Sequence, residues 1–446
     1  MKNILVIGAG RSATSLIRYL TANANAENWS VTVADYDREL ALAKTKGAEH
    51  TKAIQLDIKD EENLGKAISE ADVVVSMVPA TFHPLVAKVC LKLKKHLVSA
   101  SYVSPEIEAM DADAKQAGII MLKECGLDPG IDHMSAMLVL DRLRIEGSEL
   151  TGFETFTGGL LAPSNDDNPW EYKFTWNPGN VVKAGNGTVK FIQENRYKFI
   201  PYHRLFRRTE MIHIPDHGYF EGYANRDSLK YLDIYGLQGI RTLYRGTLRR
   251  PSFCRAWDIF VQLGATDDSY EMENVAEMTH RQFINSFLSY NPNDSVELKL
   301  AHYTGLDLDS EEMFKLKWLG MFEEELVGIE KGTPAQILEH ILKKKWTLNE
   351  DERDMIVMWH KFDFVKNGEN HRIESHMVLE GEDSENTAMS LTVGLPMGIA
   401  VKKILSGDIK LTGVQRPVVP EIYEPILSEL ESHGIVFKES ETVCEK

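Results

Sequence analysis

Hydrophobic and polar positions along the first part of the chain alternate between two periods. Short apolar runs rich in β-branched residues, such as Asn3 to Ile7, are each followed by a stretch with helical spacing, as in Leu16, Ile17 and Leu20. Strands separated by helices in this way predict a parallel, doubly wound sheet. The predicted strands are residues 3–7, 30–34, 53–57, 72–78, 96–100 and 119–125.

The pattern changes near residue 150. Residues 152–176 alternate like a strand interrupted by turn residues, and further short strands are expected to about residue 264. Helical periodicity then runs from 271 to 352, where Thr333-Pro334 has the form of a helix cap followed by a first-turn proline. Strands are expected again at 355–365 and 374–379, before a helix over 388–405. The predicted class is α/β: a Rossmann-like doubly wound parallel sheet plus an α+β substrate domain with a helical insertion.

The first strand, turn and helix have the form of a dinucleotide-binding βαβ unit. Gly8 permits backbone angles that a side chain forbids, Gly10 lets the backbone approach a pyrophosphate, and the helix near Arg11 offers free amides. Asp35 ends the second strand, where a carboxylate accepts hydrogen bonds from a ribose and repels a 2′-phosphate. We therefore expect NAD, with NADP as the less favoured cofactor. The alternatives are a purely structural turn and a solvated Asp35.

Charge and composition exclude several classes of function. The net charge of −17 opposes binding to nucleic acid or to an anionic membrane. No apolar run approaches the length of a membrane span and the chain starts directly in a strand, so a cytoplasmic protein is expected. The four cysteines are far apart and predict free thiols and no metal site. An anionic substrate would need locally placed arginines.

Ligands of doubly wound sheets bind at the carboxyl ends of the strands. That rule predicts one crevice, formed by Gly8 to Ser12, Asp35, Leu56-Asp57, Ser76 to Pro79, Ser99 to Tyr102 and Gly126 to Pro129.

Four further stretches resemble one known family. They are Ala100-Ser101-Tyr102-Val103-Ser104-Pro105; Gly126-Leu127-Asp128-Pro129-Gly130-Ile131-Asp132-His133; Asn168-Pro169 with Tyr172-Lys173-Phe174-Thr175-Trp176; and Asn225-Arg226-Asp227-Ser228 with Arg245-Gly246-Thr247-Leu248-Arg249. Together with Gly394-Leu395-Pro396, they make the chain similar to saccharopine dehydrogenase of the glutamate-forming type, also called saccharopine reductase, over nearly its whole length.

The resemblance implies three domains: a Rossmann domain over 1–130 joined by about 388–446, an α+β substrate domain over 131–265 with about 353–387, and a helical domain over 266–352. It implies oxidation of saccharopine with a nicotinamide cofactor and water, through an imine, to glutamate and 2-aminoadipate 6-semialdehyde. The implied cofactor-binding residues are Gly8, Gly10, Arg11, Ser12, Asp35, Leu56, Asp57, Met77, Ser101, Leu127, Asp128, Pro129 and Thr175. The implied substrate-binding residues are Ser101, Tyr102, Asp128, Arg226, Arg245, Gly246 and Thr247.

The chemistry of these residue types agrees with the implied roles. Saccharopine carries three carboxylates, which arginines such as Arg226 and Arg245 bind through paired hydrogen bonds. Asp128 and Tyr102 are the expected catalytic residues, with Asp128 orienting the secondary amine or assisting proton transfer. The structural alternatives are a surface turn for Arg226, a strand bend for Gly246-Thr247, a core tyrosine for Tyr102 and a helix cap for Asp128.

Other possible bases are His83, His133 and Lys173, although a lone histidine is more often structural. This chain departs from the fungal and animal family members at two positions. Thr157 stands where they have cysteine, and Thr175 stands where they have serine. The alternation of Trp170, Tyr172, Phe174 and Trp176 indicates a half-buried strand or a subunit contact rather than a platform for stacking bases.

Three functions remain open at this level. The favoured one is an NAD-dependent saccharopine dehydrogenase, acting as a homodimer on small molecules. The second is an imine reductase like carboxynorspermidine dehydrogenase, against which the motifs around Arg226 and Arg245 weigh. The third is a non-catalytic protein that senses NAD(H) and binds a partner, against which the intact set of polar crevice residues weighs.

Overall fold

The computed structural model describes residues 1–163 and 168–444, which form two compact units. Unit 1 comprises Met1–Glu149 and Met377–Lys438, and unit 2 comprises Leu150–His376 and the chain from Glu439 onward. Because each unit has its own core, each is described by itself. The predicted division into three domains stays a prediction.

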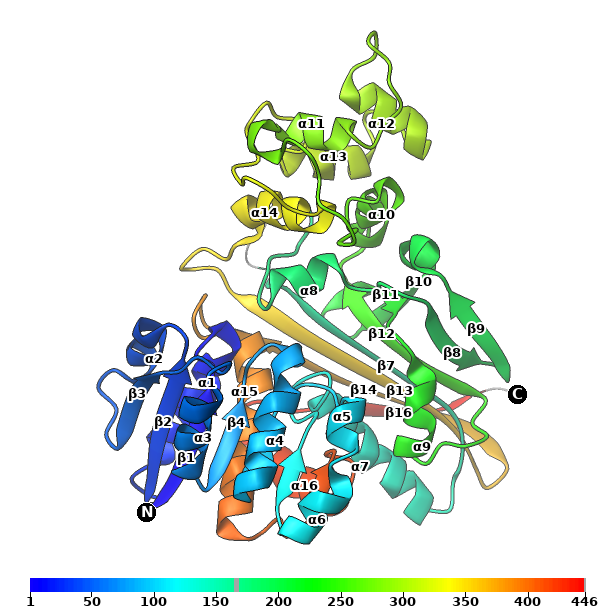
Figure 1. Ribbon diagram of the computed structural model, residues 1–446. Coiled ribbons are helices and arrows are strands. Elements are labelled where there is room, and N and C mark those ends of the chain that lie inside the picture. Colours follow the sequence, from blue (N-terminus) through cyan, green and yellow to red (C-terminus); the bar gives the residue numbers. More distant parts are fainter. Residues whose placement is uncertain (164–167, 445–446) are drawn as a thin grey trace. The chain divides into compact units, whose positions relative to one another are not determined.

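Unit 1 is built on a seven-stranded sheet in the order β15-β6-β5-β4-β1-β2-β3, and every neighbouring pair is parallel (Figure 1). The order of its first six strands is that of a Rossmann fold, so the predicted fold class is confirmed. The strands are β1 (Lys2–Ile7), β2 (Trp29–Asp35), β3 (Thr51–Gln55), β4 (Val73–Ser76), β5 (His96–Val98), β6 (Ile120–Leu122) and β15 (Gly413–Gln415).

Helices connect these strands on both faces of the sheet, as right-handed crossovers require. They are α1 (Thr14–Asn23), α2 (Arg38–Thr45), α3 (Glu61–Ser69), α4 (His83–Leu93), α5 (Pro105–Glu108), α6 (Asp111–Ala117), α7 (Ile131–Ile145), α15 (Ala388–Ser406) and α16 (Pro420–Glu431). Single-turn 3-10 helices precede α1 and α4, at Arg11–Ala13 and Ala80–Phe82.

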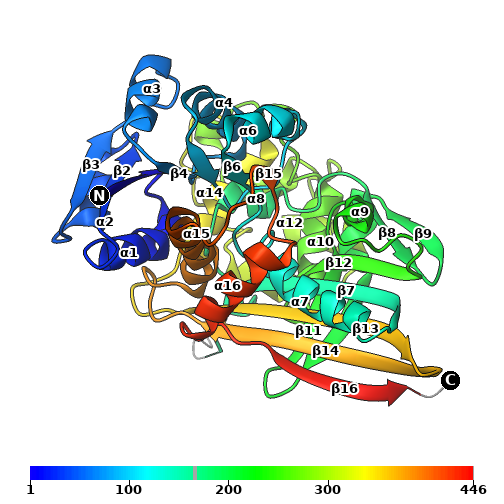
Figure 2. The same cartoon turned by 90° about the horizontal axis from the view of Figure 1, so that it is seen from below.

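Helix α15 lies directly against α1 (Figure 2). A Cβ at Gly394 would come within 2.6 Å of the Leu16 amide nitrogen, so the glycine permits this close approach. By length and hydropathy α15 also resembles a membrane span, and the expectation that no run is long and apolar enough is therefore wrong. The apolar window is 72% buried inside the protein, which identifies α15 as a core helix of unit 1.

Unit 2 is built on a mixed sheet with β12 near its centre (Figure 1). Its main path is β10-β11-β12-β7-β13-β14-β16, and β8 pairs with both β12 and β9. The strands are β7 (Glu149–Leu161), β8 (Val189–Gln193), β9 (Arg196–Ile200), β10 (Thr209–Ile214), β11 (Gly218–Ala224), β12 (Thr242–Arg249), β13 (Asp354–Lys366), β14 (Glu369–Glu380) and β16 (Lys438–Cys444).

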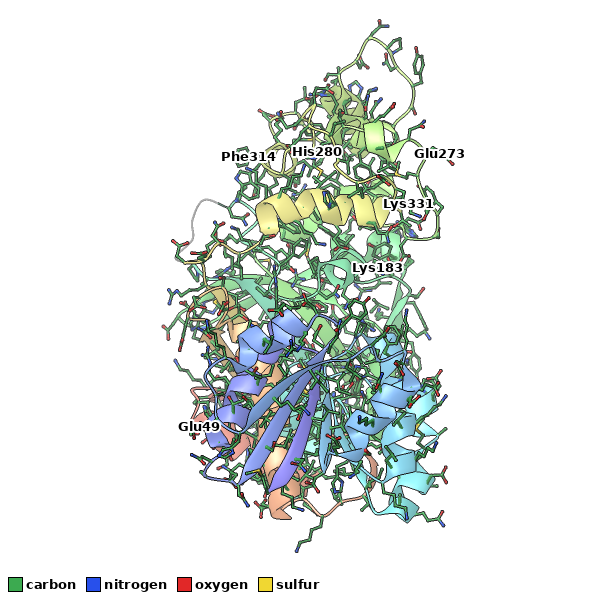
Figure 3. All side chains as sticks on the ribbon, turned by 60° about the vertical axis from the view of Figure 1, so that its left-hand side comes forward. Glu49, Lys183, Glu273, His280, Phe314 and Lys331 are labelled. Atoms are coloured by element: carbon green, nitrogen blue, oxygen red, sulfur yellow. The ribbon has the colours of Figure 1, made fainter. Side chains whose placement is uncertain are left out.

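The helices of unit 2 are α8 (Pro178–Val182), α9 (Tyr231–Ile234), α10 (Phe253–Leu263), α11 (His280–Asn285), α12 (Val296–Thr304), α13 (Glu311–Trp318) and α14 (Pro334–Trp346), with 3-10 turns at Tyr202–Arg207, Ser228–Lys230 and Val275–Glu277. The predicted cap at Thr333 is confirmed, since its side chain accepts from the Gln336 amide and Gln336 returns the bond. Figure 3 shows His280 and Phe314 among these helices.

The aromatic segment at 170–176 does not form the half-buried strand that the sequence predicted. Trp170, Tyr172 and Phe174 are 1% exposed and pack edge-to-face on Trp346 at the end of α14, with ring centroids 5.0–5.3 Å apart. The segment forms no strand beyond a single bridge between Phe174 and Thr347. Its alternation therefore reflects burial against a helix, and the buried rings offer no platform for bases.

Candidate active site

The turn after β1 has the shape that a dinucleotide pyrophosphate requires. Gly8 has a φ of +107°, and a Cβ there would lie 3.0 Å from the Met77 carbonyl oxygen, so only glycine suits this position. A Cβ at Gly10 would meet nothing within 4 Å, which leaves open space beside the backbone. Arg11–Ala13 then form a 3-10 turn that leads into α1. The residues present therefore suit a nicotinamide dinucleotide.

Asp35 does not present the free carboxylate that the sequence predicted. Its Oδ2 accepts a hydrogen bond of 2.6 Å from the Ala9 amide, and its Oδ1 accepts one of 2.9 Å from the Asp37 amide. Both oxygens therefore hold the backbone of the turns that follow β1 and β2. An acceptor already engaged in this way is a weak basis for distinguishing a ribose hydroxyl from a phosphate.

The other predicted crevice residues of unit 1 come together at the carboxyl edge of its parallel sheet. Since all seven strands run in one direction, the segments that follow them share this edge. Leu56 is buried, and Asp57 is exposed and accepts from the Lys59 amide. The Met77 amide donates to the Ile7 carbonyl and so joins the ends of β4 and β1. Their contacts with a cofactor stay predictions.

Ser101, Tyr102 and Asp128 also lie at the carboxyl edge of the unit 1 sheet. The Tyr102 hydroxyl donates to Asp128 Oδ1 at 3.3 Å, and all three residues are partly exposed, so Tyr102 is not a closed core residue. Gly130, rather than Asp128, is the N-cap of α7, and its amide donates to Asp132 Oδ1 at 2.6 Å. The pair of Tyr102 and Asp128 can thus hold and exchange a proton at the crevice.

Two of the other possible bases have structural partners. His133 Nε2 lies 2.9 Å from Glu124 Oε2 in a fully buried pair, and Arg416 Nε donates to the second Glu124 oxygen at 3.1 Å. Although burial opposes the charged form, these bonds lower the pKa of Glu124 to about 2. Lys173 Nζ donates to both Glu352 oxygens at 2.6 Å within unit 2. Neither His133 nor Lys173 is placed to act as a general base.

In unit 2, Arg226 follows the end of β11 and Arg245 lies in the middle of the neighbouring strand β12. The Asn225 amide donates to the Arg245 carbonyl at 2.9 Å, which places Arg226 beside the middle of β12. Arg226 is exposed and has a φ of +51°, whereas Arg245 is buried and its guanidinium lies 4.0 Å from the centroid of the Tyr231 ring. Gly246 has a packing role as well, since a Cβ there would enter the ring of Phe156.

Sequence reasoning missed Arg249. Arg245, Thr247 and Arg249 alternate along β12 and so project from one face of the sheet. Thr157 of β7 and Tyr223 of β11 pair directly with Thr247 and share that face. The period-2 spacing within the quoted motif was the signal that could have identified Arg249. Thr155 of β7 pairs with Arg245 and adds a further hydroxyl to this face. Glu221 of β11 pairs with Arg249, and its carboxylate accepts from the Thr209 hydroxyl and the Cys254 amide.

Arg249 is 5% exposed and packed among rings, with its guanidinium 4.8 Å from the centroid of Tyr172 and 5.3 Å from that of Phe253. Its Nη1 donates to the Leu248 carbonyl, and among the described residues it forms no ion pair with a carboxylate. The buried hydroxyls of Thr157 and Thr175 also have no partner in the described part of the chain. A buried cation on the same face as the unsatisfied Thr157 hydroxyl is suited to an anionic ligand.

Two family models match the chain in sequence order. Residues 4–122 match the model of the "Saccharopine dehydrogenase NADP binding domain", and residues 126–435 match that of the "Saccharopine dehydrogenase C-terminal domain". The chain is 33% identical to "Saccharopine dehydrogenase [NADP(+), L-glutamate-forming]" of Saccharomyces cerevisiae, covering 98% of this chain and 99% of that protein. It is 32% identical to the mitochondrial alpha-aminoadipic semialdehyde synthase of Rattus norvegicus, of which it spans 48%.

The names of these relatives correct the cofactor prediction. The fungal relatives are named for NADP(+) and the matching amino-terminal model describes an NADP-binding domain, so the expectation of NAD over NADP is contradicted. The physical reason lies in Asp35, whose carboxylate holds backbone amides instead of standing free.

A solved structure of the same family also matches this chain. The apo saccharopine dehydrogenase (L-Glu forming) from Saccharomyces cerevisiae superimposes with a TM-score of 0.88 at 31% identity, covering 99% of this chain and 100% of the other. With both family models matched in order and a full-length relative above 30% identity, the chain belongs to the saccharopine dehydrogenase family.

Proposed function

We propose that this chain oxidises saccharopine with a nicotinamide dinucleotide and water, giving glutamate and 2-aminoadipate 6-semialdehyde. The observation that carries the proposal is the face of β12, where Arg245 and Arg249 flank Thr247 in a chain of net charge −17. The two Cα atoms lie about 13 Å apart along a strand, a spacing suited to two carboxylates of one elongated substrate. A tricarboxylate requires such fixed cationic groups.

Each residue has a role in the proposed reaction that follows from its chemistry. When bound, the nicotinamide supplies the acceptor for the hydride. Arg245 and Arg249 bind carboxylates, and the Thr157 and Thr247 hydroxyls add donors. Asp128, hydrogen bonded to Tyr102, takes the proton from the secondary amine and returns one when the carbinolamine collapses. Most of the rate enhancement then comes from holding the reacting groups in line.

The assay follows absorbance of the reduced nicotinamide when saccharopine is added with NADP+ or NAD+. We expect turnover with saccharopine and 2-aminoadipate 6-semialdehyde among the products. Carboxynorspermidine serves as the competing substrate, because it carries fewer carboxylates. Turnover with carboxynorspermidine but not with saccharopine would assign the second candidate, and tight binding of the reduced cofactor without any turnover would assign the third.

Asp35→Ala is expected to weaken the binding of NADPH and of NADH to a similar degree. Removing the carboxylate releases the Ala9 and Asp37 amides, and a lost charge-assisted hydrogen bond costs about 1.5–3 kcal/mol. Quenching of protein fluorescence by NADPH and by NADH measures both dissociation constants. Asp37→Ala is the matched control, because it removes the carboxylate that accepts from the Glu39 amide and keeps the Asp37 amide that Asp35 holds. A change confined to one cofactor would show that Asp35 does select between them.

We also propose that the chain acts as a homodimer, which sedimentation velocity at several concentrations tests. A single species with the mass of one chain would contradict it.

A further inference from the structure

His83 connects two serines at the carboxyl edge of the unit 1 sheet. Its Nδ1 lies 2.9 Å from the Oγ of Ser76, the last residue of β4, and its Nε2 lies 2.7 Å from the Oγ of Ser101, which follows β5. His83 is 2% exposed and Ser76 is 1% exposed, whereas Ser101 is partly exposed at the carboxyl edge of the sheet. The buried imidazole therefore bridges a buried serine and a partly exposed one.

We propose that His83 is a positioning residue that fixes the direction of the Ser101 hydroxyl, and so sets whether Ser101 donates to the bound ligand or accepts from it. The inference rests on the proposed function, together with the contacts of Ser101 with cofactor and substrate that the family resemblance implies. A neutral imidazole has one N–H and one acceptor nitrogen. If Nε2 carries the hydrogen, it donates to Ser101 and the serine hydrogen turns to the ligand. If Nδ1 carries it, Ser101 donates to Nε2 and offers only lone pairs to the ligand.

The surroundings keep the imidazole neutral. Burial, followed by the charge of Lys123, lowers the pKa of His83 to about 3. A protonated imidazole would have two donors and would remove the acceptor that the bridge uses. His83 thus changes from a possible general base into a fixed partner for Ser101, and the backbone supports this arrangement because the Ser101 amide donates to Ser99 Oγ at 3.3 Å.

The kinetic test is a double-mutant cycle of His83→Gln and Ser101→Ala. We expect His83→Gln to lower kcat/KM about tenfold, and the double variant to be within about twofold of Ser101→Ala alone, since coupled residues are not additive. His96→Gln is the matched control, because His96 lies in the same unit at the start of β5 and accepts from the Ile120 amide. It should leave activity unchanged. Fully multiplicative effects of His83→Gln and Ser101→Ala would overturn the proposal.

A second test needs neither substrate nor cofactor. In protein labelled with nitrogen-15 at histidine, we expect His83 to show one protonated ring nitrogen from pH 5 to pH 9. Ser101→Ala should shift the Nε2 signal and Ser76→Ala the Nδ1 signal. Protonation of both nitrogens in this range, or unchanged shifts in both variants, would refute the bridge even in an active enzyme. Absence of saccharopine turnover with an intact bridge would instead refute the proposed function.

Discussion

Replacing Arg249 with Met is expected to raise the Michaelis constant for saccharopine by roughly 30- to 1,000-fold while leaving the fold intact. Loss of a buried charged partner of a ligand costs about 2–4 kcal/mol of binding. The same guanidinium has no carboxylate partner among the described residues, so its removal relieves a buried charge. We therefore expect the free energy of unfolding to fall by no more than about 1 kcal/mol, since a well-packed apolar side chain often replaces a buried charge without loss.

The neighbouring arginine gives a matched control for this variant. Arg250 follows Arg249 directly, is half-buried over the Phe220 ring and lies 3.7 Å from Glu171, away from the face that carries Thr247. Arg250→Met should leave the Michaelis constant within about twofold, because Arg250 follows the end of β12 and packs over Phe220 instead of on the face of Thr247. Steady-state kinetics and urea unfolding of both variants separate the two roles. An unchanged Michaelis constant with a large loss of stability would make Arg249 a structural cation.

The sequence predicted the parallel sheet because its signals are local. Each strand of unit 1 ends where an apolar run meets a turn, and the run from Asn3 to Ile7 needs only its own period and Gly8 to be recognised. The cap at Thr333 is local in the same sense, since its two hydrogen bonds join residues three apart. Signals of this kind do not depend on the rest of the fold.

The errors arose where a distant contact decides the outcome. Asp35 appeared free because its partner, the Ala9 amide, lies 26 residues earlier in the chain. The aromatic alternation at 170–176 resembled a strand because the rings pack on Trp346 of α14, and no local pattern shows that these two distant segments are in contact. The apolar length of α15 reflects burial on most sides within unit 1. Arg249 shares a face with Arg245 and Thr247 by its period-2 spacing, but only the pairing of Thr247 with Thr157 places the β7 hydroxyl on that face.

Lys123 follows β6, and its burial has a large expected effect on stability. The side chain is 0% exposed, and its ammonium has no hydrogen-bond partner in the described part of the chain. Burial lowers the pKa of Lys123 to about 7, against the smaller opposing effect of Glu124. The folded state therefore binds this proton more weakly than the unfolded state does.

The sign of the pH dependence follows from that difference. Between pH 7 and the pKa of an unfolded lysine, about 10.4, the unfolded chain holds one more proton, so this lysine makes stability rise with pH. Below pH 7 the lysine is charged in both states, so the full cost of burying its ammonium destabilises the folded state. Lys123→Met should consequently raise the free energy of unfolding of unit 1 by about 3 kcal/mol at pH 6, an order-of-magnitude figure from a shift of this size, and the gain should shrink toward pH 10.

Urea unfolding of the two proteins at pH 6, 8 and 10 measures this effect, with Lys92→Met as the control, because Lys92 is an exposed lysine of α4. The control should change stability by less than about 0.5 kcal/mol at each pH. Two outcomes would contradict this prediction: a Lys123→Met protein that is less stable than the unmodified protein at pH 6, or a change in the free energy of unfolding that is the same at pH 6 and pH 10. Either would show that the fold does not disfavour the charged ammonium. A gain confined to low pH would show that unit 1 keeps a costly charge beside His83, at the crevice edge where stability is commonly given up for function.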